Sequence, residues 1–412
     1  MKSWPDIYLP DLAGDITFPA LALFDTKSRS VRPLPQRDLY RLYVCGITPY
    51  DATHLGHAAT YLTFDLIHRY LRAQGSQVSF VENITDIDDP LLERAKRDNV
   101  DWQSLATSQI DLFRSDMVDL HILPPTHYIG VIESIPEIIS AIEEIIRSGH
   151  TYSLDGDLYC DIHQDKSFGS RSHLSRDEAR AIFGERGGDP DRSGKRDPLD
   201  PLLWRAHHPG EPGWESPFGL GRPGWHIECQ AIAINYLGTH DSGALIDIQG
   251  GGSDLIFPHH EMSAAQVHLQ KDREFADFYV HAGMIGLDGE KMSKSRGNLV
   301  FVSKLTAQGV HPMAIRTALM RQHFAADRMW SSELLIQAQD FIDSLTLALS
   351  KSEVAPTHVL VQEIVEDLSR NLDTPCIFQR LDDWIARTRA GETGGSAGEL
   401  SRALDSLLGI AL

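Results

Sequence analysis

The sequence predicts an α/β fold: a Rossmann-type domain with a parallel sheet, interrupted by an insertion and followed by a bundle of helices. Three observations support this prediction. Residues 39–81 alternate strand, helix and strand patterns, and the alternation returns at residues 226–284 after a polar interval. From about residue 303 onward only helical patterns follow. Strands joined through a helix lie parallel in one sheet, so the two alternating stretches indicate two halves of one domain.

The first alternating stretch forms a βαβ unit. Leu39–Gly46 is a short apolar run that stops at a glycine, which is typical of a buried strand. Residues 57–73 carry apolar side chains at helical spacing, and Gly75 lies just past their end, where helices favour glycine. Gln77–Val81 then predicts the second strand.

The middle of the chain changes character. Helical patterns at 104–120 and 131–148 are followed by a strand-like stretch, Tyr152–Ile162, with a turn at Gly156. The polar run at 184–198, GERGGDPDRSGKRDP, then predicts a surface loop inside an inserted region.

The α/β pattern returns at His226–Leu237, Leu245–Ile248 and Phe278–Met284. In the C-terminal region Ser331 is expected to cap one helix, and Thr374-Pro375 opens another. We therefore expect five parts, and residues 1–38 look Pro-rich and irregular. The parts are an N-terminal extension (1–38), the first half of the catalytic domain (39–149), an inserted region (150–222), the second half (223–302) and a helical domain (303–412).

Composition narrows the function. The chain has 412 residues and a net charge of −20, from 38 basic and 58 acidic residues, which argues against a broad phosphate-gripping surface. The early Pro and Asp residues exclude a secretory signal, and no run of about 18 apolar residues predicts a membrane span. We therefore expect a cytoplasmic protein with thiols or metal ligands rather than disulfides. Its four cysteines are Cys45, Cys160, Cys229 and Cys376.

The string HLGH, His54–His57, lies between the first strand and its helix. By itself such a string is more often structural. Its position favours function, because α/β sheets bind ligands at the carboxyl ends of their strands and helix N-termini attract phosphate oxygens. Two imidazoles and a glycine at this point suit a triphosphate.

The string KMSKS, Lys291–Ser295, is either a solvated basic loop or a cationic arm that neutralises a leaving pyrophosphate. Together, HLGH and KMSKS resemble the signature pair of class I aminoacyl-tRNA synthetases. The resemblance implies a class I synthetase-type Rossmann domain, also called HUP-like. It also implies MgATP as substrate, formation of an aminoacyl adenylate, and catalytic roles for His54, His57, Lys291 and Lys294.

Cys45, Cys229 and His259 lie in segments next to the presumed ATP site. Scattered cysteines and histidines are usually core residues. Three such ligands with an open fourth position nevertheless describe a catalytic zinc site. Zinc binds a thiolate far better than a hydroxyl, so it would separate cysteine from serine.

Four segments, VCGIT, ENITDIDD, PGWHIEC and GGGSDLIFPHHE, resemble cysteinyl-tRNA synthetase, and the resemblance covers about residues 40–330. Trp225 could instead be an ordinary buried aromatic residue, and Asp254 an ordinary cap or turn residue, with no role in binding. The resemblance implies that the adenylate is lined by Cys45, Gly46, Ile47, Thr48, Thr60, Asn83, Ile84, Thr85, Trp225, Gly252, Ser253, Asp254 and Ile285.

Several positions depart from that family. Ser263 stands where the synthetases have a fourth zinc ligand, Glu, and Ala59, Pro90 and Gln249 replace Arg, Lys and His. The chain after KMSKS is also shorter than in most synthetases. These departures are typical of a sister family, the cysteine ligases of mycothiol biosynthesis in actinobacteria. The chain also resembles that family in two strings, GHAATY at 56–61 and ERGGDP at 185–190. A disordered polar loop remains the structural alternative for ERGGDP.

The second resemblance implies one zinc per chain and a ligase that adenylates L-cysteine and transfers it to the amine of glucosaminyl-inositol, with AMP and diphosphate released. The expected partners are these small molecules, with no tRNA and no membrane, and the expected state is a monomer. Ala59 and Gln249 are candidates for sugar binding. Two alternatives stay open: a short cysteinyl-tRNA synthetase, and a non-catalytic paralogue that binds zinc and nucleotide.

Overall fold

The computed structural model describes residues 1–51, 53–287, 289–292 and 297–412. Its centre is a five-stranded, fully parallel sheet in the order β11-β10-β3-β4-β5. The strands are β3 (Leu39–Val44), β4 (Gln77–Ile84), β5 (His127–Gly130), β10 (Ile246–Gly252) and β11 (Ala276–Ala282). The predicted parallel-sheet domain is therefore confirmed.

Helices cover both faces of this sheet. Alternate residues of β3 point to opposite sides, with Leu42 and Val44 in one core and Tyr43 in the other. The first core includes α1 (Leu55–Ala73) and α3 (Trp102–Asp119). The helices of the second core are α4 (Ile135–Arg147), α6 (Trp225–Leu237) and α7 (Glu261–Lys271). The short elements α2 (Asp89–Asp98), η1 (Ile132–Ser134) and η2 (Ile162–Gln164) complete the connections.

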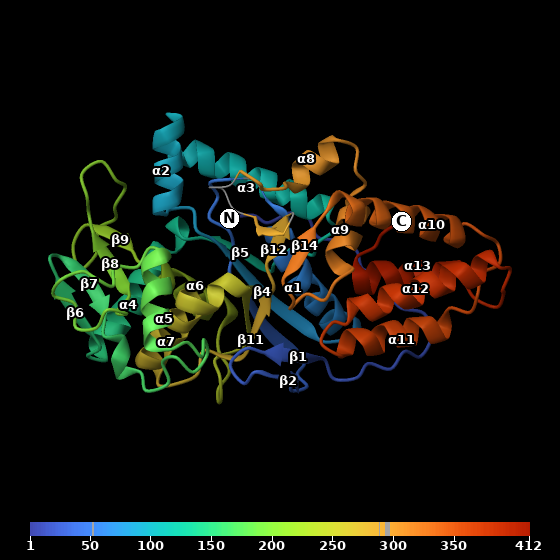
Figure 1. Ribbon diagram of the computed structural model, residues 1–412. Coiled ribbons are helices and arrows are strands. Elements are labelled where there is room, and N and C mark those ends of the chain that lie inside the picture. Colours follow the sequence, from blue (N-terminus) through green and yellow to red (C-terminus); the bar gives the residue numbers. More distant parts are fainter. Residues whose placement is uncertain (52, 288, 293–296) are drawn as a thin grey trace.

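The inserted region forms a separate antiparallel sheet in the order β6-β7-β8-β9. Figure 1 shows it in green, with α5, at one end of the molecule, while the C-terminal helices occupy the other end. Its elements are β6 (Thr151–Leu154), β7 (Asp157–Cys160), α5 (Arg176–Glu185), β8 (Leu202–Ala206) and β9 (Gly221–Pro223). The five-part division of the chain stays a proposal.

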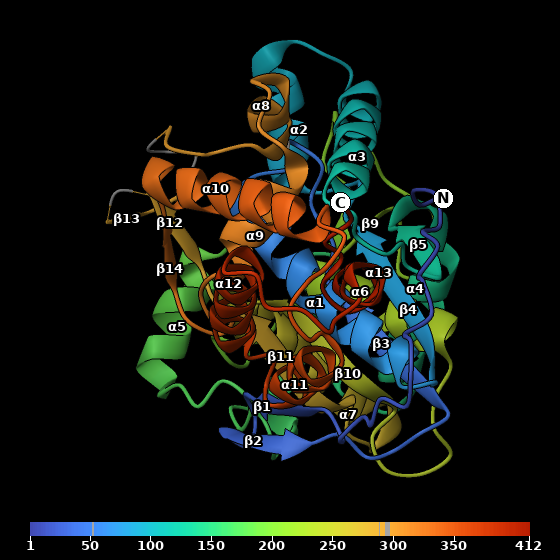
Figure 2. The same cartoon turned by 90° about the vertical axis from the view of Figure 1, so that its right-hand side faces the viewer.

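The C-terminal region is helical as predicted, and Ser331 caps its first long helix by accepting a hydrogen bond from the Leu334 amide. Figure 2 looks onto this end, where α11, α12 and α13 lie in front of α1. The helices are α8 (Val302–Ala307), α9 (Pro312–Met320), α10 (Ser332–Leu349), α11 (His358–Ser369), α12 (Thr374–Arg389) and α13 (Ala397–Leu408). Among the residues described, every helix is too short or too polar to span a lipid bilayer.

Two short sheets were not expected. The region 1–38 was interpreted as irregular, but β1 (Ala22–Asp25) and β2 (Ser30–Pro33) form a hairpin whose turn lies against β11, with the Thr26 amide 2.9 Å from the Tyr279 carbonyl. A strand also interrupts the helical C-terminal part, in a sheet of β12 (Ile285–Leu287), β13 (Glu290–Lys291) and β14 (Arg328–Trp330). Strands of two to four residues are too short to show a periodic pattern.

A buried ion cluster joins the parallel-sheet domain to the helical region. Asp65 on α1 pairs with Arg69, 2.8 Å away, and with Arg316 on α9, and all three side chains are fully buried. The two guanidinium groups also donate to carbonyl oxygens at the end of α13, Asp405 and Leu408, at 2.7 Å each. One carboxylate therefore holds three helices together.

Replacing Asp65 by Asn should strongly destabilise the fold, because two guanidinium groups would stay buried without a counter-charge. The expected loss is about 3–5 kcal/mol in the free energy of unfolding, measured by urea denaturation. Asp382→Asn is the control, since it breaks the Arg321 pair at 2.8 Å on the surface, where the loss should stay below about 1 kcal/mol. Equal losses in the two variants would contradict this account.

The same carboxyl should make the fold sensitive to acid. Burial alone would raise the pKa of Asp65, but Arg69 and Arg316 outweigh it and lower the pKa to about 2, from an ordinary value of 3.8. The stabilisation is therefore complete above about pH 4 and is lost as the pH falls toward 2. Unfolding measured across this range should show a drop in stability that the Asp65→Asn variant lacks.

Candidate active site

A cavity of about 1010 Å³ opens at the carboxyl ends of the central strands. Its walls come from the β3–α1 loop, the turn between β4 and α2, the start of α6, the end of β10 and the inserted region. This is the edge at which open parallel sheets bind their ligands. Chain segments more than 200 residues apart meet here because β3 pairs with β10, and the Cys45 amide donates to the Gly250 carbonyl at 3.1 Å.

Gly46 lets the loop after β3 touch the end of β4. The Asn83 side-chain oxygen accepts hydrogen bonds from the Gly46 amide and the Tyr43 hydroxyl, each at 2.9 Å. A Cβ atom on Gly46 would lie 1.5 Å from the Asn83 carbonyl oxygen, so no other residue fits without moving the backbone. The close contact fixes the position of Cys45 at the cavity wall.

Cys45, Cys229 and His259 converge beside the cavity. Their possible ligand atoms all lie within 4.8 Å of one another, and all three side chains are buried. They come from the end of β3, from α6 and from the turn η4 (Ile256–His260). The three residues that the sequence analysis grouped as metal-ligand candidates therefore lie next to one another in the fold.

These residues fit a tetrahedral metal site with one open position. The Nε2 atom of His259 is buried with no hydrogen-bond partner among the residues that the structure describes, while its Nδ1 lies 3.0 Å from Nδ1 of His226. Burial, and then the neighbouring His226, keep the pKa of His259 well below its ordinary value, so the imidazole is neutral, as a ligand must be. Two thiols and one imidazole are a donor set that suits zinc.

A line of hydrogen bonds supports Cys45 from behind. Its Sγ lies 3.2 Å from Nε2 of His260, whose Nδ1 lies 2.8 Å from His281, and His281 reaches the Thr26 hydroxyl at 2.7 Å. Such partners orient the ligands of a metal site. Ser263 is not part of the trio, because its hydroxyl donates to the His226 carbonyl at 3.0 Å.

The HLGH segment also lines the cavity. Nδ1 of His54 caps α1 by accepting from the amides of Gly56 at 3.1 Å and His57 at 3.4 Å, and the two imidazoles stack with centroids 3.8 Å apart. Burial lowers the pKa of His54 to about 4 and that of His57 well below its ordinary value. Both rings are therefore neutral at pH 7 and can act as hydrogen-bond donors rather than cations.

The structure distributes the other predicted residues as follows. Asn83, Ile84 and Thr85 lie buried behind the wall, and Ser253 begins the short turn η3 (Ser253–Leu255). Lys291 belongs to β13, and Lys294 lies outside the described residues. The predicted residues that line the cavity are Cys45, Gly46, Ile47, Thr48, His54, His57, Thr60, Trp225, Gly252, Asp254 and Ile285.

The polar run at 184–198 was predicted as a surface loop, but its first part forms a wall of the cavity. Arg186 donates to the backbone carbonyls of Asp254 and Phe257, which ties the loop to the segment that carries His259. Gly188 packs so closely that a Cβ atom would lie 2.5 Å from the Phe183 ring. The unusual ERGGDP string was the only signal in the sequence for this role.

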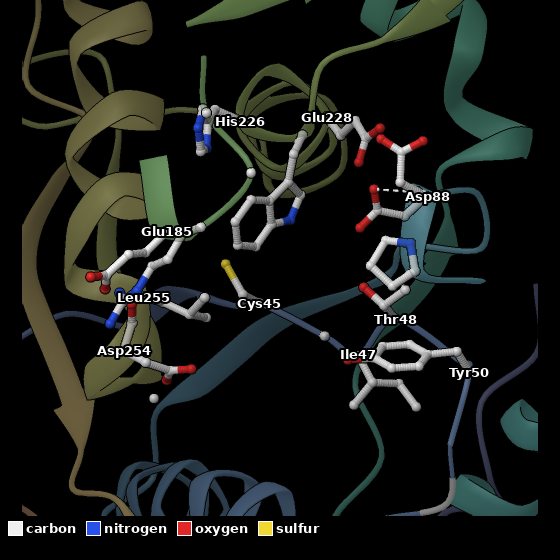
Figure 3. A pocket seen from close by; sticks show the side chains of 18 of the residues that line it. Cys45, Ile47, Thr48, Tyr50, Asp88, Glu185, His226, Glu228, Asp254 and Leu255 are labelled. Carbon is white, nitrogen blue, oxygen red and sulfur yellow. Dashed lines mark hydrogen bonds between the residues drawn. The ribbon is translucent and has the colours of Figure 1, made fainter. Parts of the chain in front are cut away.

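Several other wall residues were not predicted as site residues, although some lie in the strings quoted above. They come from the turn before α2, from the inserted region and from α6: Asp88, Asp89, Pro90, Asp157, Tyr159, Arg192, Arg205, Arg222 and Glu228, of which Figure 3 labels Asp88 and Glu228. Conversely, the candidate sugar-binding residues Ala59 and Gln249 are fully buried and, within the described ranges, do not line the cavity. That expectation is wrong because both side chains face the protein core.

Solved structures share this architecture. The chain aligns with Mycobacterium tuberculosis methionyl-tRNA synthetase in complex with methionyl-adenylate, with a TM-score of 0.63, 17% identity and 91% of this chain and 89% of that chain covered. It also aligns with the Agrobacterium radiobacter leucyl-tRNA synthetase ternary complex, with a TM-score of 0.60, 11% identity and 91% and 83% covered. Residues 31–340 match the profile described as tRNA synthetases class I (C) catalytic domain. The fold and the cavity thus define a catalytic domain of the class I synthetase type.

More similar relatives narrow the class. Proteins named L-cysteine:1D-myo-inositol 2-amino-2-deoxy-alpha-D-glucopyranoside ligase from Gordonia bronchialis and Nocardia farcinica are 53% and 49% identical, over 100% of both chains. Ligase 2 from Corynebacterium jeikeium is 53% identical over the same full extent. The chain belongs to this ligase family.

The trio predicts the behaviour of metal-site variants. Cys229→Ala should remove the metal, measured as metal per chain by atomic emission after desalting, because two ligands hold a cation far more weakly than three. Ser263→Ala and Cys160→Ala should keep about one metal per chain, since Cys160 is a buried thiol of the inserted sheet. Metal retained in Cys229→Ala, or lost in Cys160→Ala, would show that the site lies elsewhere.

Proposed function

We propose that this protein is an AMP-forming ligase that adenylates L-cysteine and joins it to the amine of glucosaminyl-inositol, 1D-myo-inositol 2-amino-2-deoxy-alpha-D-glucopyranoside. The observation that carries the proposal is the Cys45, Cys229 and His259 trio in a class I synthetase cavity. Relatives of full length and about half identity carry the name of the same reaction. AMP and diphosphate are the other products.

In the first half-reaction the trio would hold zinc, which supplies a Lewis acid selective for a thiolate over a hydroxyl. The Trp225 indole stacks on the His259 ring with centroids 4.3 Å apart, so it holds this ligand in place and narrows the space for the amino acid. The neutral His54 and His57 would donate hydrogen bonds to phosphate oxygens of MgATP at the N-terminus of α1.

In the second half-reaction the amine nitrogen of the sugar attacks the carbonyl carbon of the cysteinyl adenylate. A C–N bond forms, the C–O bond to the phosphate breaks, and AMP leaves with the electron pair. A neutral amine is a stronger nucleophile than a ribose hydroxyl, so the site needs mainly to orient it. We further infer a monomer that works in the cytoplasm on small molecules, without tRNA.

Product analysis tests this function. Purified protein given ATP, cysteine and glucosaminyl-inositol should form the amide with one AMP and one diphosphate per amide. It should not cysteinylate tRNA at a comparable enzyme concentration, because the chain carries 38 basic against 58 acidic residues and a tRNA must be held largely through its phosphates. Efficient tRNA charging without amide formation would instead establish a short cysteinyl-tRNA synthetase.

Lys294 is proposed to stabilise the charge that develops on the leaving pyrophosphate. Lys294→Ala should therefore lower the rate of cysteine-dependent ATP–pyrophosphate exchange about 10²–10³-fold while changing the KM for ATP by less than about threefold. Lys351→Ala is the matched control, because that ammonium binds the Thr388 carbonyl at 3.0 Å within the C-terminal helices. A variant that mainly loses ATP affinity would make Lys294 a ground-state contact.

A further inference from the structure

Two carboxyl groups of the cavity wall have no task in the reaction as described so far. Glu228 lies on α6 directly before Cys229, and Asp88 lies in the turn between β4 and α2, where it caps α2 by accepting from the Asp89 amide at 2.8 Å. Figure 3 shows both side chains at the same side of the cavity, near Thr48. Their chemistry indicates what that side of the cavity binds.

Glu228 is a buried carboxyl with one oxygen that has no hydrogen-bond partner among the described residues. Only 3% of the residue is exposed, and its Oε2 atom makes no hydrogen bond to any residue that the structure describes. Burying an unpaired carboxyl costs free energy, so such a group in a cavity wall indicates a partner supplied by a ligand.

The nearby arginines are occupied elsewhere. Arg222 bonds to Asp89 and lies 3.7 Å from Glu211, and Arg205 bonds to Asp89 at 3.0 Å. Asp88 and Glu228 are therefore two carboxyls on one wall, and among the described residues neither has an arginine or lysine within ion-pair distance. Burial raises the pKa of Asp88 to about 6, although the Asp89 amide and the charge of Arg222 act in the opposite direction.

A primary amine is the ligand group that best suits two such carboxyls, because it brings two or three N–H donors and, when protonated, a positive charge. The reaction contains two amines, the α-amine of cysteine and the amine of the sugar. Figure 3 shows Asp88 and Glu228 across Cys45 from Asp254 and Leu255. A Cβ atom on Gly252 would contact the side chains of both Asp254 and Thr60, so Asp254 lies near the start of α1, where the phosphates of ATP are proposed to bind. Asp88 and Glu228 therefore lie on the side of Cys45 away from the proposed phosphate site, which is the side left for the attacking sugar.

We propose that Asp88 and Glu228 form the subsite for the amine of the acceptor sugar. The inference rests on the proposed function. The two carboxyls accept hydrogen bonds from the nitrogen and direct its lone pair toward the carbonyl carbon. As the C–N bond forms and AMP departs, the surplus proton on nitrogen passes to water.

The test compares the two half-reactions in Glu228→Gln and Asp88→Asn. Each change keeps the shape of the side chain, and Asn remains a good helix N-cap. In amide formation the KM for glucosaminyl-inositol should rise about tenfold or more, as expected for a lost hydrogen bond to a charged group. In ATP–pyrophosphate exchange the KM values for cysteine and ATP should stay within about twofold of the unchanged protein. Unchanged exchange also shows that both variants fold.

Binding of an analogue gives a second readout that a merely structural effect would not move. Glucosyl-inositol carries a hydroxyl in place of the amine. With the unchanged protein its inhibition constant should be much higher than the dissociation constant of the amino-sugar. Glu228→Gln should remove most of this difference. The matched control is Glu215→Gln, which removes an exposed carboxylate that, within the described ranges, does not line the cavity, and it should leave the KM for the amino-sugar within about twofold.

Three results would overturn the inference. If the KM for cysteine in the exchange reaction rises and the KM for the amino-sugar does not, the pair binds the α-amine of cysteine. If the unchanged protein forms the amide and both variants keep its KM for the amino-sugar, the acceptor subsite lies elsewhere and the proposed function stands. If the unchanged protein forms no amide at all, the proposed function itself fails.

Discussion

The parallel pairing of β3 with β10 is the constraint on which the site depends. It aligns Val44 with Gly250, two residues from opposite halves of the catalytic domain, and so places the loop after β3 next to the segment that follows β10. Gly250 permits this arrangement, because a Cβ atom there would lie 2.2 Å from the Phe64 ring on α1. Cys45 and His259 become neighbours only through this pairing, and the N-terminus of α1 reaches the same edge.

The inserted region and the C-terminal helices contact the elements at this edge of the parallel sheet. The inserted sheet carries a loop over the cavity and fastens it through Arg186 to the segment before His259. On the opposite side, the helical region is tied to α1 by the buried Asp65 cluster. The helix that begins at HLGH is therefore braced at its middle by the C-terminal region.

Much of the site was predictable because its residues belong to recognisable strings at strand ends. HLGH, Cys45 and His259 follow strands of the parallel sheet, so their convergence follows once the βαβ order is known. Cys229 lies within α6, and its place beside them is visible only in the fold. The direction in which a single side chain points could not be predicted from the sequence. Ala59 and Thr60 are neighbours, yet a helix turns by about 100° per residue, and Thr60 lines the cavity while Ala59 faces the core.

The inserted region was the hardest to predict. Its strands are short, and the position of its loop over the cavity depends on tertiary contacts such as those of Arg186 and Gly188. Glu228 was also overlooked, although it lies inside the GWHIEC string, because burial without a partner is visible only in three dimensions.

The central claim is that Cys45, Cys229 and His259 hold a metal whose open position accepts the thiolate of the substrate. X-ray absorption at the zinc edge, recorded on the metal-loaded protein before and after addition of L-cysteine, tests this most directly. The account predicts two sulfur neighbours and one imidazole nitrogen in the free protein, and one further sulfur when cysteine is bound. L-Serine should leave the spectrum unchanged. A sulfur count that does not rise with cysteine would contradict the account.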